Sequence, residues 1–224
     1  MTISGLGCVD GPLYSLKNAN PYYRAQWSKD RELGPTYGDR IAELDLLREQ
    51  IRDMDPTKQR EWANNLERVI KHDPSPEMRA KAVDAIAYVQ DSATERALNL
   101  ASGDDNEKVR LAACRAWRVL GGSAARSRLM TLAQNDSETT SVRQEAIESL
   151  AVFDDAEVRR LLARLLDDPS PAVQYQVAMT LKNSTGRDYG GDFEAWKKFL
   201  AGEDVAAAPA ASMADKLWNA LPSL

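Results

Sequence analysis

A helix-forming unit recurs four times in this chain, and this repetition constrains the fold more than any other feature. Each copy places an apolar residue beside a polar one, at Met78-Arg79, Val109-Arg110, Val142-Arg143 and Val173-Gln174. The polar members of these pairs are separated by 31, 33 and 31 residues. The tetrapeptide Asp-Pro-Ser-Pro opens the first and fourth copies, at Asp73 and Asp168. A regular period of this kind indicates stacked structural units rather than a duplicated active site.

Each copy has the apolar spacing of an amphipathic helix. In the third copy, Val142, Ala146 and Leu150 recur at every fourth residue and share one helical face. Shorter segments with helical spacing alternate with these copies and begin near Thr57, Ala93, Ala124 and Ala156. The repeating unit is therefore predicted to be a helix, a short acidic loop and a second helix. One such hairpin cannot bury its apolar face alone, whereas stacked neighbours form a continuous core.

The composition agrees with an all-α protein. Hydrophobic residues make up 43% of the chain but aromatic residues only 7%, because much of the apolar content is Ala and Leu. The alternation at period two that marks strands is nearly absent. A net charge of −5 supplies no basic field, so we expect no nucleic-acid partner.

Few side chains in this sequence are candidates for catalysis or metal binding. The cysteines Cys8 and Cys114 form no metal-binding pair, and Cys114 lies in an Ala-rich run that is typical of a buried position. The only histidine, His72, falls at the end of a predicted helix, where a cation is favourable. Paired acids recur in step with the repeat, which favours helix capping over metal binding. We therefore predict no catalytic residue, no metal and no cofactor.

The repeat resembles the HEAT family, in particular its short bacterial form, which has Asp in the loop and then Val-Arg and Ala in the second helix. The resemblance covers residues 56–185. It implies a right-handed α-solenoid of about four hairpins, in which the motif Asp and Arg join neighbouring loops. Carried onto this sequence, the motif residues are Asp73, Arg79, Asp104, Arg110, Asp136, Arg143 and Asp168. The fourth copy has Gln174 in place of Arg, so we expect the ladder to weaken there.

Three parts of the chain are expected, namely an aromatic and Pro-containing arm over 1–36, the solenoid over 37–202 and a tail over 203–224. Capping helices are predicted at both ends of the repeats, over residues 36–54 and after residue 185. The tail begins with an Ala/Pro linker and ends with apolar residues at helical spacing, which are Met213, Leu217, Trp218 and Leu221. This last part is predicted either to dock on its own chain or to bind another protein.

The N-terminal sequence MTISGLGC resembles the processing site of bacterial lipoproteins, in which the Cys is lipidated. The match is partial, because no basic and no long apolar region precedes Cys8. Two locations therefore stay open. One is the cytoplasm, and the other is the bacterial cell envelope, with a lipid on Cys8 as the membrane attachment, if the true start lies upstream.

We predict a non-enzymatic scaffold that binds another protein on its concave face, which the resemblance implies is built from the second helices. The outward positions of these helices are Lys81, Asp84, Arg115, Arg118, Gln144, Glu148, Tyr175 and Lys182. Arg115, Arg118 and Tyr175 are of the residue types that contribute most to interfaces. The alternative is a protein that binds or attaches a bilin-type small molecule, as the related phycobilin lyases do. A deep apolar pocket with convergent polar groups would favour that alternative, and a shallow open groove would contradict it.

Overall fold

The computed structural model describes residues 34–206, and all regular elements in this range are helices. Cys8 and most of the predicted N-terminal arm lie outside the described residues, and so does most of the predicted tail. Lipidation at Cys8 therefore stays a prediction.

The chain divides into two compact units between Leu47 and Arg48, later in the sequence than the predicted boundary after residue 36. Most of α2 (Tyr37–Gln50) belongs to the first unit, and the short 3-10 helix η2 (Ile51–Asp53) belongs to the second. These two elements occupy the range predicted for an N-terminal capping helix. The capping role of this range stays a prediction.

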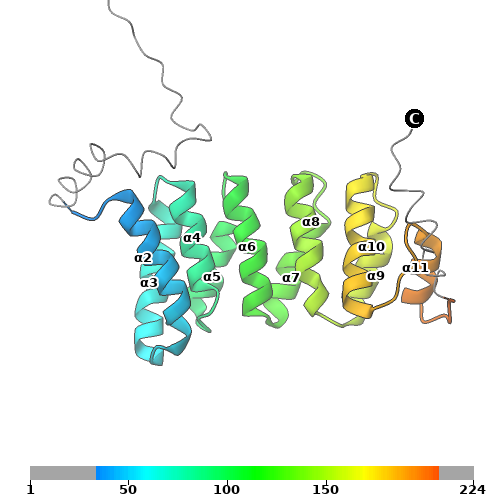
Figure 1. Cartoon of the computed structure of the whole chain (residues 1–224), viewed down its shortest axis with the longest axis horizontal. Helices are drawn as coiled ribbons and strands as arrows, with labels where there is room; N and C mark the ends of the chain where they lie inside the picture. Colours follow the sequence, from blue (N-terminus) through cyan, green and yellow to red (C-terminus); the bar gives the residue numbers. More distant parts are fainter. Residues whose placement is uncertain (1–33, 207–224) are drawn as a thin grey trace, which may run out of the picture. The chain divides into compact units, whose positions relative to one another are not determined.

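Four helical hairpins follow in the second unit, and each consists of a first and a second helix. The first helices are α3 (Pro56–His72), α5 (Ser92–Ala101), α7 (Gly122–Ala133) and α9 (Ala156–Leu165). The second helices are α4 (Pro76–Ile86), α6 (Glu107–Leu120), α8 (Thr140–Ser149), which the 3-10 helix η3 (Leu150–Val152) continues, and α10 (Pro171–Thr185). The second helices pack side by side in sequence order, α4 on α6, α6 on α8 and α8 on α10 (Figure 1). The predicted all-α solenoid of helical hairpins is confirmed.

The second helices begin where their sequences supply N-cap residues. The N-cap positions are occupied by Ser75, Asn106, Thr139 and Ser170. In the first and fourth copies the next residues, Pro76 and Pro171, open the helix, where the missing N–H of proline costs no hydrogen bond. The repeated Asp-Pro-Ser-Pro is therefore a loop followed by a helix start, as the sequence predicts.

Small residues at one position of the second helices allow these helices to pack closely. This position holds Ala82, Ala113, Ala146 and Val177, each with 0% exposure. Cys114 is also fully buried, and burial raises the pKa of its thiol to about 12. Cys114 is thus a small core residue with an unreactive thiol.

The helix α11 (Phe193–Leu200) follows the fourth hairpin and packs beside α9. Trp196 is fully buried, and the ring of Tyr189 meets it edge-on with 4.8 Å between the ring centroids. The hydroxyl of Tyr189 donates a hydrogen bond to the carbonyl of Val205 at 3.1 Å. These contacts join α11 to the segments that directly precede and follow it.

Candidate functional site

A tight turn positions a carboxylate ahead of the second helix in three of the four hairpins. In each turn an Asp Oδ1 accepts a hydrogen bond at 2.9 Å from the main-chain N–H of the N-cap residue, in the pairs Asp73–Ser75, Asp104–Asn106 and Asp168–Ser170. The turn fixes the orientation of the Asp side chain relative to the helix that follows. The loops therefore present acidic groups at a regular position along the stack.

The arginine of the first repeat joins two neighbouring loops. Arg79 Nη1 donates to the carbonyl of Asp73 in its own loop at 2.9 Å. Its Nε and Nη2 donate to the two carboxylate oxygens of Asp104 in the next loop, at 2.8 and 2.7 Å. A guanidinium that binds a carboxylate through two parallel hydrogen bonds fixes both the distance and the orientation of its partner.

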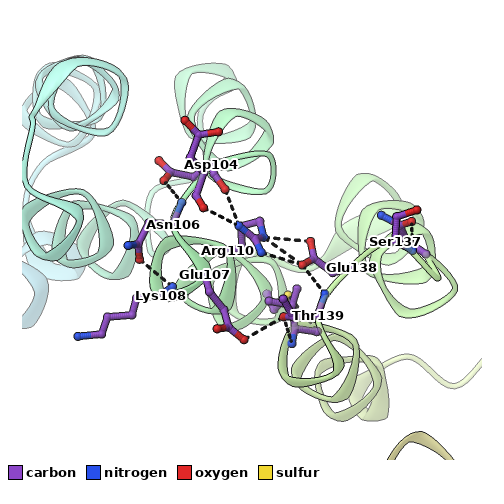
Figure 2. A network of polar contacts seen from close by, with 12 residues as sticks. Asp104, Asn106, Glu107, Lys108, Arg110, Ser137, Glu138 and Thr139 are labelled. Atoms are coloured by element: carbon purple, nitrogen blue, oxygen red, sulfur yellow. Dashed lines mark hydrogen bonds and ion pairs between the residues drawn. The ribbon is translucent and has the colours of Figure 1, made fainter. Parts of the chain in front are cut away.

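Arg110 of the second repeat joins its own loop to the next one in the same way, but it binds a Glu instead of an Asp. Arg110 Nη1 donates to the carbonyl of Asp104 at 2.8 Å, and Nη2 donates to Glu138 Oε1 at 2.8 Å. Figure 2 shows Arg110 between its own loop and Glu138 of the next one. The motif alignment assigned Asp136 to this position, and that assignment is wrong. The side chain of Asp136 does not bind Arg110; it is 83% exposed and lies 3.6 Å from Arg143.

The length of the third loop explains this exchange. The interval from Asn106 to Thr139 is two residues longer than the other two intervals between N-caps. The turn in this loop is made by Asn135, whose side chain accepts from the Ser137 N–H at 3.1 Å. The added length displaces the turn from the helix start, and the longer side chain of Glu138 supplies the carboxylate beside the N-cap. Sequence reasoning missed Glu138, although the 33-residue interval signalled the insertion.

The third rung is the most deeply buried. The side chains of Arg143 and Asp168 are 7% and 4% exposed, and Arg143 donates to Asp168 through both Nη1, at 3.3 Å, and Nη2. Arg143 Nε also donates to the carbonyl of Ala133 at 3.0 Å. The three pairs Arg79–Asp104, Arg110–Glu138 and Arg143–Asp168 are called the loop ladder below.

The fourth copy keeps half of the arrangement. Gln174 Nε2 donates to the carbonyl of Asp168 in its own loop at 2.9 Å, as Arg79 and Arg110 do with theirs. The neutral amide supplies no ion pair to a further loop. The ladder therefore ends at the residue where the sequence departs from its own motif.

In the first pair of the loop ladder, Arg79 and Asp104 each stabilise the charged form of the other. Burial alone raises the pKa of the Asp104 carboxyl, but hydrogen bonds from Arg79 and from the Asn106 N–H outweigh it and lower that pKa below its usual value. The hydrogen bond to Asp104 raises the pKa of Arg79. An ion pair that is fixed by two parallel hydrogen bonds is suited to holding loops together rather than to moving protons.

The outward residues of the second helices form a different set of contacts, called the second-helix face below. Arg115 and Arg118 on α6 reach Glu145 and Glu148 on α8, at 3.4 and 3.8 Å. Three of the residues predicted for partner binding, Arg115, Arg118 and Glu148, are thus engaged with the neighbouring repeat. Glu145 completes this pairing and was not among the predicted residues.

The other predicted residues of this face lie on the same helices. Gln144 Nε2 donates to the carbonyl of Ala172 at the start of α10, at 3.1 Å. Lys182 pairs with Asp188 at 2.7 Å, and the side chain of Tyr175 is exposed. Lys81 and Asp84 are half-buried on α4.

A separate apolar cavity lies at the C-terminal end of the repeats. Its volume is about 710 Å³, and its apolar lining includes Leu150, Val158, Leu162, Leu181, Phe199 and Leu200. Among its polar lining residues, Ser184 and Thr185 donate their hydroxyls to the Leu181 carbonyl, at 3.3 and 2.6 Å. Asp154 and Arg159 form an ion pair with each other. The polar groups of the cavity wall are therefore engaged with the chain itself.

Three further observations concern catalysis, metal binding and membrane spanning. His72 is exposed in the last turn of α3. Within residues 34–206, no group of three or more His, Cys, Asp or Glu side chains is arranged to hold a metal ion. Nor is any helix of that range both long and apolar enough to cross a membrane.

Paired helices stacked in four copies, with arginine–carboxylate contacts between successive loops, define an α-helical repeat protein. A family model of HEAT repeats matches residues 63–141 and again residues 136–189. The chain therefore belongs to the HEAT-repeat family. HEAT repeats generally mediate protein–protein interaction. Comparison with curated proteins gives no match.

Proposed function

We propose that this chain is a non-enzymatic scaffold that binds another protein on its second-helix face. The observation that carries the proposal is the side chain of Tyr175 on α10, which is 63% exposed although it is a large aromatic residue. Val119 and Val152 are exposed at equivalent distances from the N-caps of their repeats, by 43% and 59%. Tyrosine is one of the residue types enriched among the anchors of protein interfaces, and the two valines add apolar surface near it.

The charged residues around these anchors support the same proposal. Arg115 and Arg118 are held only by partly exposed ion pairs, and such pairs contribute little to stability in water. A partner that carries carboxylates could therefore take over these arginines at small cost. The loop ladder offers no such freedom, because its arginines are buried in bidentate pairs.

The alternative of bilin-type binding or lyase activity would use the cavity beside α11. Its size falls within the range of small-molecule sites, which favours this alternative to that extent. Its two hydroxyls donate to the Leu181 carbonyl, and its Asp154–Arg159 ion pair is exposed, so these residues do not supply the buried polar groups that orient a small molecule. We therefore rank the scaffold first, and small-molecule occupancy becomes an outcome of the experiment on this cavity below.

The proposal is tested by placing a photo-crosslinking benzoylphenylalanine at position 175 in cells that express the chain. The matched control is the same amino acid at position 62, since Trp62 is an exposed aromatic residue on the first helix α3. We expect an adduct with another protein from position 175 and none from position 62. The adduct is identified by mass spectrometry and the partner is then purified.

Binding of the purified partner is measured by calorimetry with the unchanged chain, Tyr175→Ala and Trp62→Ala. We expect Tyr175→Ala to weaken binding by about tenfold or more, as loss of an aromatic anchor does, and Trp62→Ala to leave it unchanged. Equal affinities for all three chains, or an adduct only from position 62, would refute the second-helix face as the binding surface.

A further inference from the structure

The helix α11 packs beside α9 at the end of the repeats (Figure 1). It does not continue the repeat as a first helix would, because its end at Phe199 and Leu200 lies around one cavity with the first half of α9 and the end of α10. A first helix would instead run parallel to α9 and end near the start of α10. The chain leaves α11 at this cavity through Ala201 and Gly202, which also line it.

The cavity lies at the C-terminal end of the repeats, and its walls come from η3, α9, α10 and the end of α11. Most of its lining residues are aliphatic or aromatic, and Asp154, Arg159, Ser184 and Thr185 add polar groups. Leu181 and Val158 in these walls are buried, whereas Phe199 and Leu200 of α11 are partly exposed. A hollow of about 710 Å³ has room for several large side chains.

The sequence beyond Ala206 has the properties of a segment that could fill this cavity. Met213, Leu217, Trp218 and Leu221 follow one another at the spacing of a single helical face. Asp215 falls on the opposite side of such a helix, so the segment has one apolar and one polar face. Its apolar face matches the cavity in chemical character.

The connection is also long enough. Gly202 lines the cavity, and the eleven residues from Gly202 to Met213 span up to about 35 Å when extended. Ala dominates the stretch between them, and Pro209 within it disfavours a continuous helix, so the stretch can act as a linker. A short tether also keeps the effective concentration of the segment high at the cavity, which favours docking within one chain over binding to a second molecule.

We propose that residues 213–221, called the C-terminal segment, dock in this cavity of their own chain, against η3, α9, α10 and the end of α11. Leu217 and Trp218 fill the cavity, and Met213 and Leu221 extend the contact on either side. Docking of the C-terminal segment is distinct from partner binding at Tyr175, because Tyr175 lies in the first half of α10, whereas the cavity is lined by the last turns of α10 together with η3, α9 and α11.

Hydrogen exchange of the full chain, read by mass spectrometry, tests this docking. The double variant Leu217→Ser/Trp218→Ser removes the apolar anchors, and Asp215→Ser/Lys216→Ser is the matched control on the polar side. We expect amides of η3, of the end of α10 and of α11 to exchange about tenfold faster in the first variant and at the unchanged rate in the control. Amides of the loop ladder, at Asp104–Asn106, serve as an internal reference that stays constant in all chains.

A peptide of residues 207–224, added at saturating concentration to the Leu217→Ser/Trp218→Ser chain, should restore the slow exchange. The same peptide with both serines should not restore it. Equal exchange in the unchanged chain and the double variant would overturn the proposal. Equal exchange together with slowing by an added bilin would assign the cavity to a small molecule instead.

Light scattering at several protein concentrations identifies which chain supplies the segment. We expect a monomer whose exchange protection at the cavity does not depend on concentration. Protection that rises together with a dimer would mean that the segment docks on a second copy, and this result would overturn docking within one chain. Circular dichroism of both double variants shows that the repeats remain folded, since the substitutions lie outside them.

Discussion

The loop ladder and the second-helix face both link neighbouring repeats through arginine–carboxylate pairs, but they do so in different surroundings. In the loop ladder the paired side chains are between 4% and 15% exposed. On the second-helix face the paired side chains are between 20% and 57% exposed. The ladder arginines also bind main-chain carbonyls, at Asp73, Asp104 and Ala133. The same pair of residue types therefore has two different roles in one stack.

Burial decides what each pair contributes. Removing one partner of a buried pair leaves an uncompensated charge, which is strongly destabilising, whereas exposed pairs contribute little. The loop ladder is thus part of the framework that sets the spacing of the repeats. The exposed pairs of the second-helix face contribute little to the fold, so the partner proposed above could replace them at small cost.

The largest effect is expected where the ladder is most buried. Arg143→Met leaves the carboxylate of Asp168 buried without its partner and removes the hydrogen bond to the Ala133 carbonyl. We expect the free energy of unfolding to fall by about 3–5 kcal/mol. The measurement is urea unfolding followed by circular dichroism.

The double variant Arg143→Met/Asp168→Asn is the control for this effect. Asn can still accept the hydrogen bond from the Ser170 N–H, so the turn is kept while the charge is removed. We expect the double variant to recover part of the stability that Arg143→Met loses. A double variant that is less stable than Arg143→Met would show that the unpaired charge is not the source of the loss.

A medium effect is expected at Asp104, and it depends on pH. The folded chain lowers the pKa of this carboxyl below its value in the unfolded chain, which is about 3.9. The stabilisation is therefore fully present well above pH 4 and is lost as the pH falls through the folded pKa. At pH 7 we expect Asp104→Asn to lower the free energy of unfolding by about 1–3 kcal/mol, the usual contribution of hydrogen bonds to a charged group.

Urea unfolding between pH 7 and pH 3 measures this dependence. The difference in stability between the unchanged chain and Asp104→Asn should shrink as the pH falls below about 4. Asp105→Asn is the matched control in the same loop, because Arg110 binds only the main-chain carbonyl of Asp105, which the substitution keeps. A difference that stays constant down to pH 3 would contradict an ion pair at Asp104.

Sequence periodicity was sufficient to predict the hairpins, and the resemblance to HEAT repeats implied most of the loop ladder. Intervals of 31, 33 and 31 residues fix which helices are neighbours, and the family motif placed the acids correctly at Asp104 and Asp168. The prediction of Asp136 as a ladder acid was wrong because two added residues in the third loop place the carboxylate of Glu138, and not that of Asp136, beside Arg110. Alignment by the motif alone counts residues and does not follow the path of a longer loop.

The remaining contacts depend on how helices are rotated against one another, and a single sequence does not specify that rotation. The pairing of Arg115 with Glu145 joins positions that differ between the two repeats, so the repeat alignment gave no signal for it. The cavity beside α11 likewise results from the packing of four elements, and its lining residues are scattered over the last part of the chain.

The smallest effect is expected on the second-helix face. Arg118→Gln removes an ion pair of 3.8 Å to Glu148 between side chains that are 35% and 57% exposed. Water and salt screen such a pair, and two long side chains lose conformational entropy when they form it. A double-mutant cycle with Glu148→Gln should give a coupling energy of about 0.5 kcal/mol or less in urea unfolding. If the coupling exceeded about 2 kcal/mol, this face would resemble the loop ladder energetically, and its arginines would no longer be available to a partner.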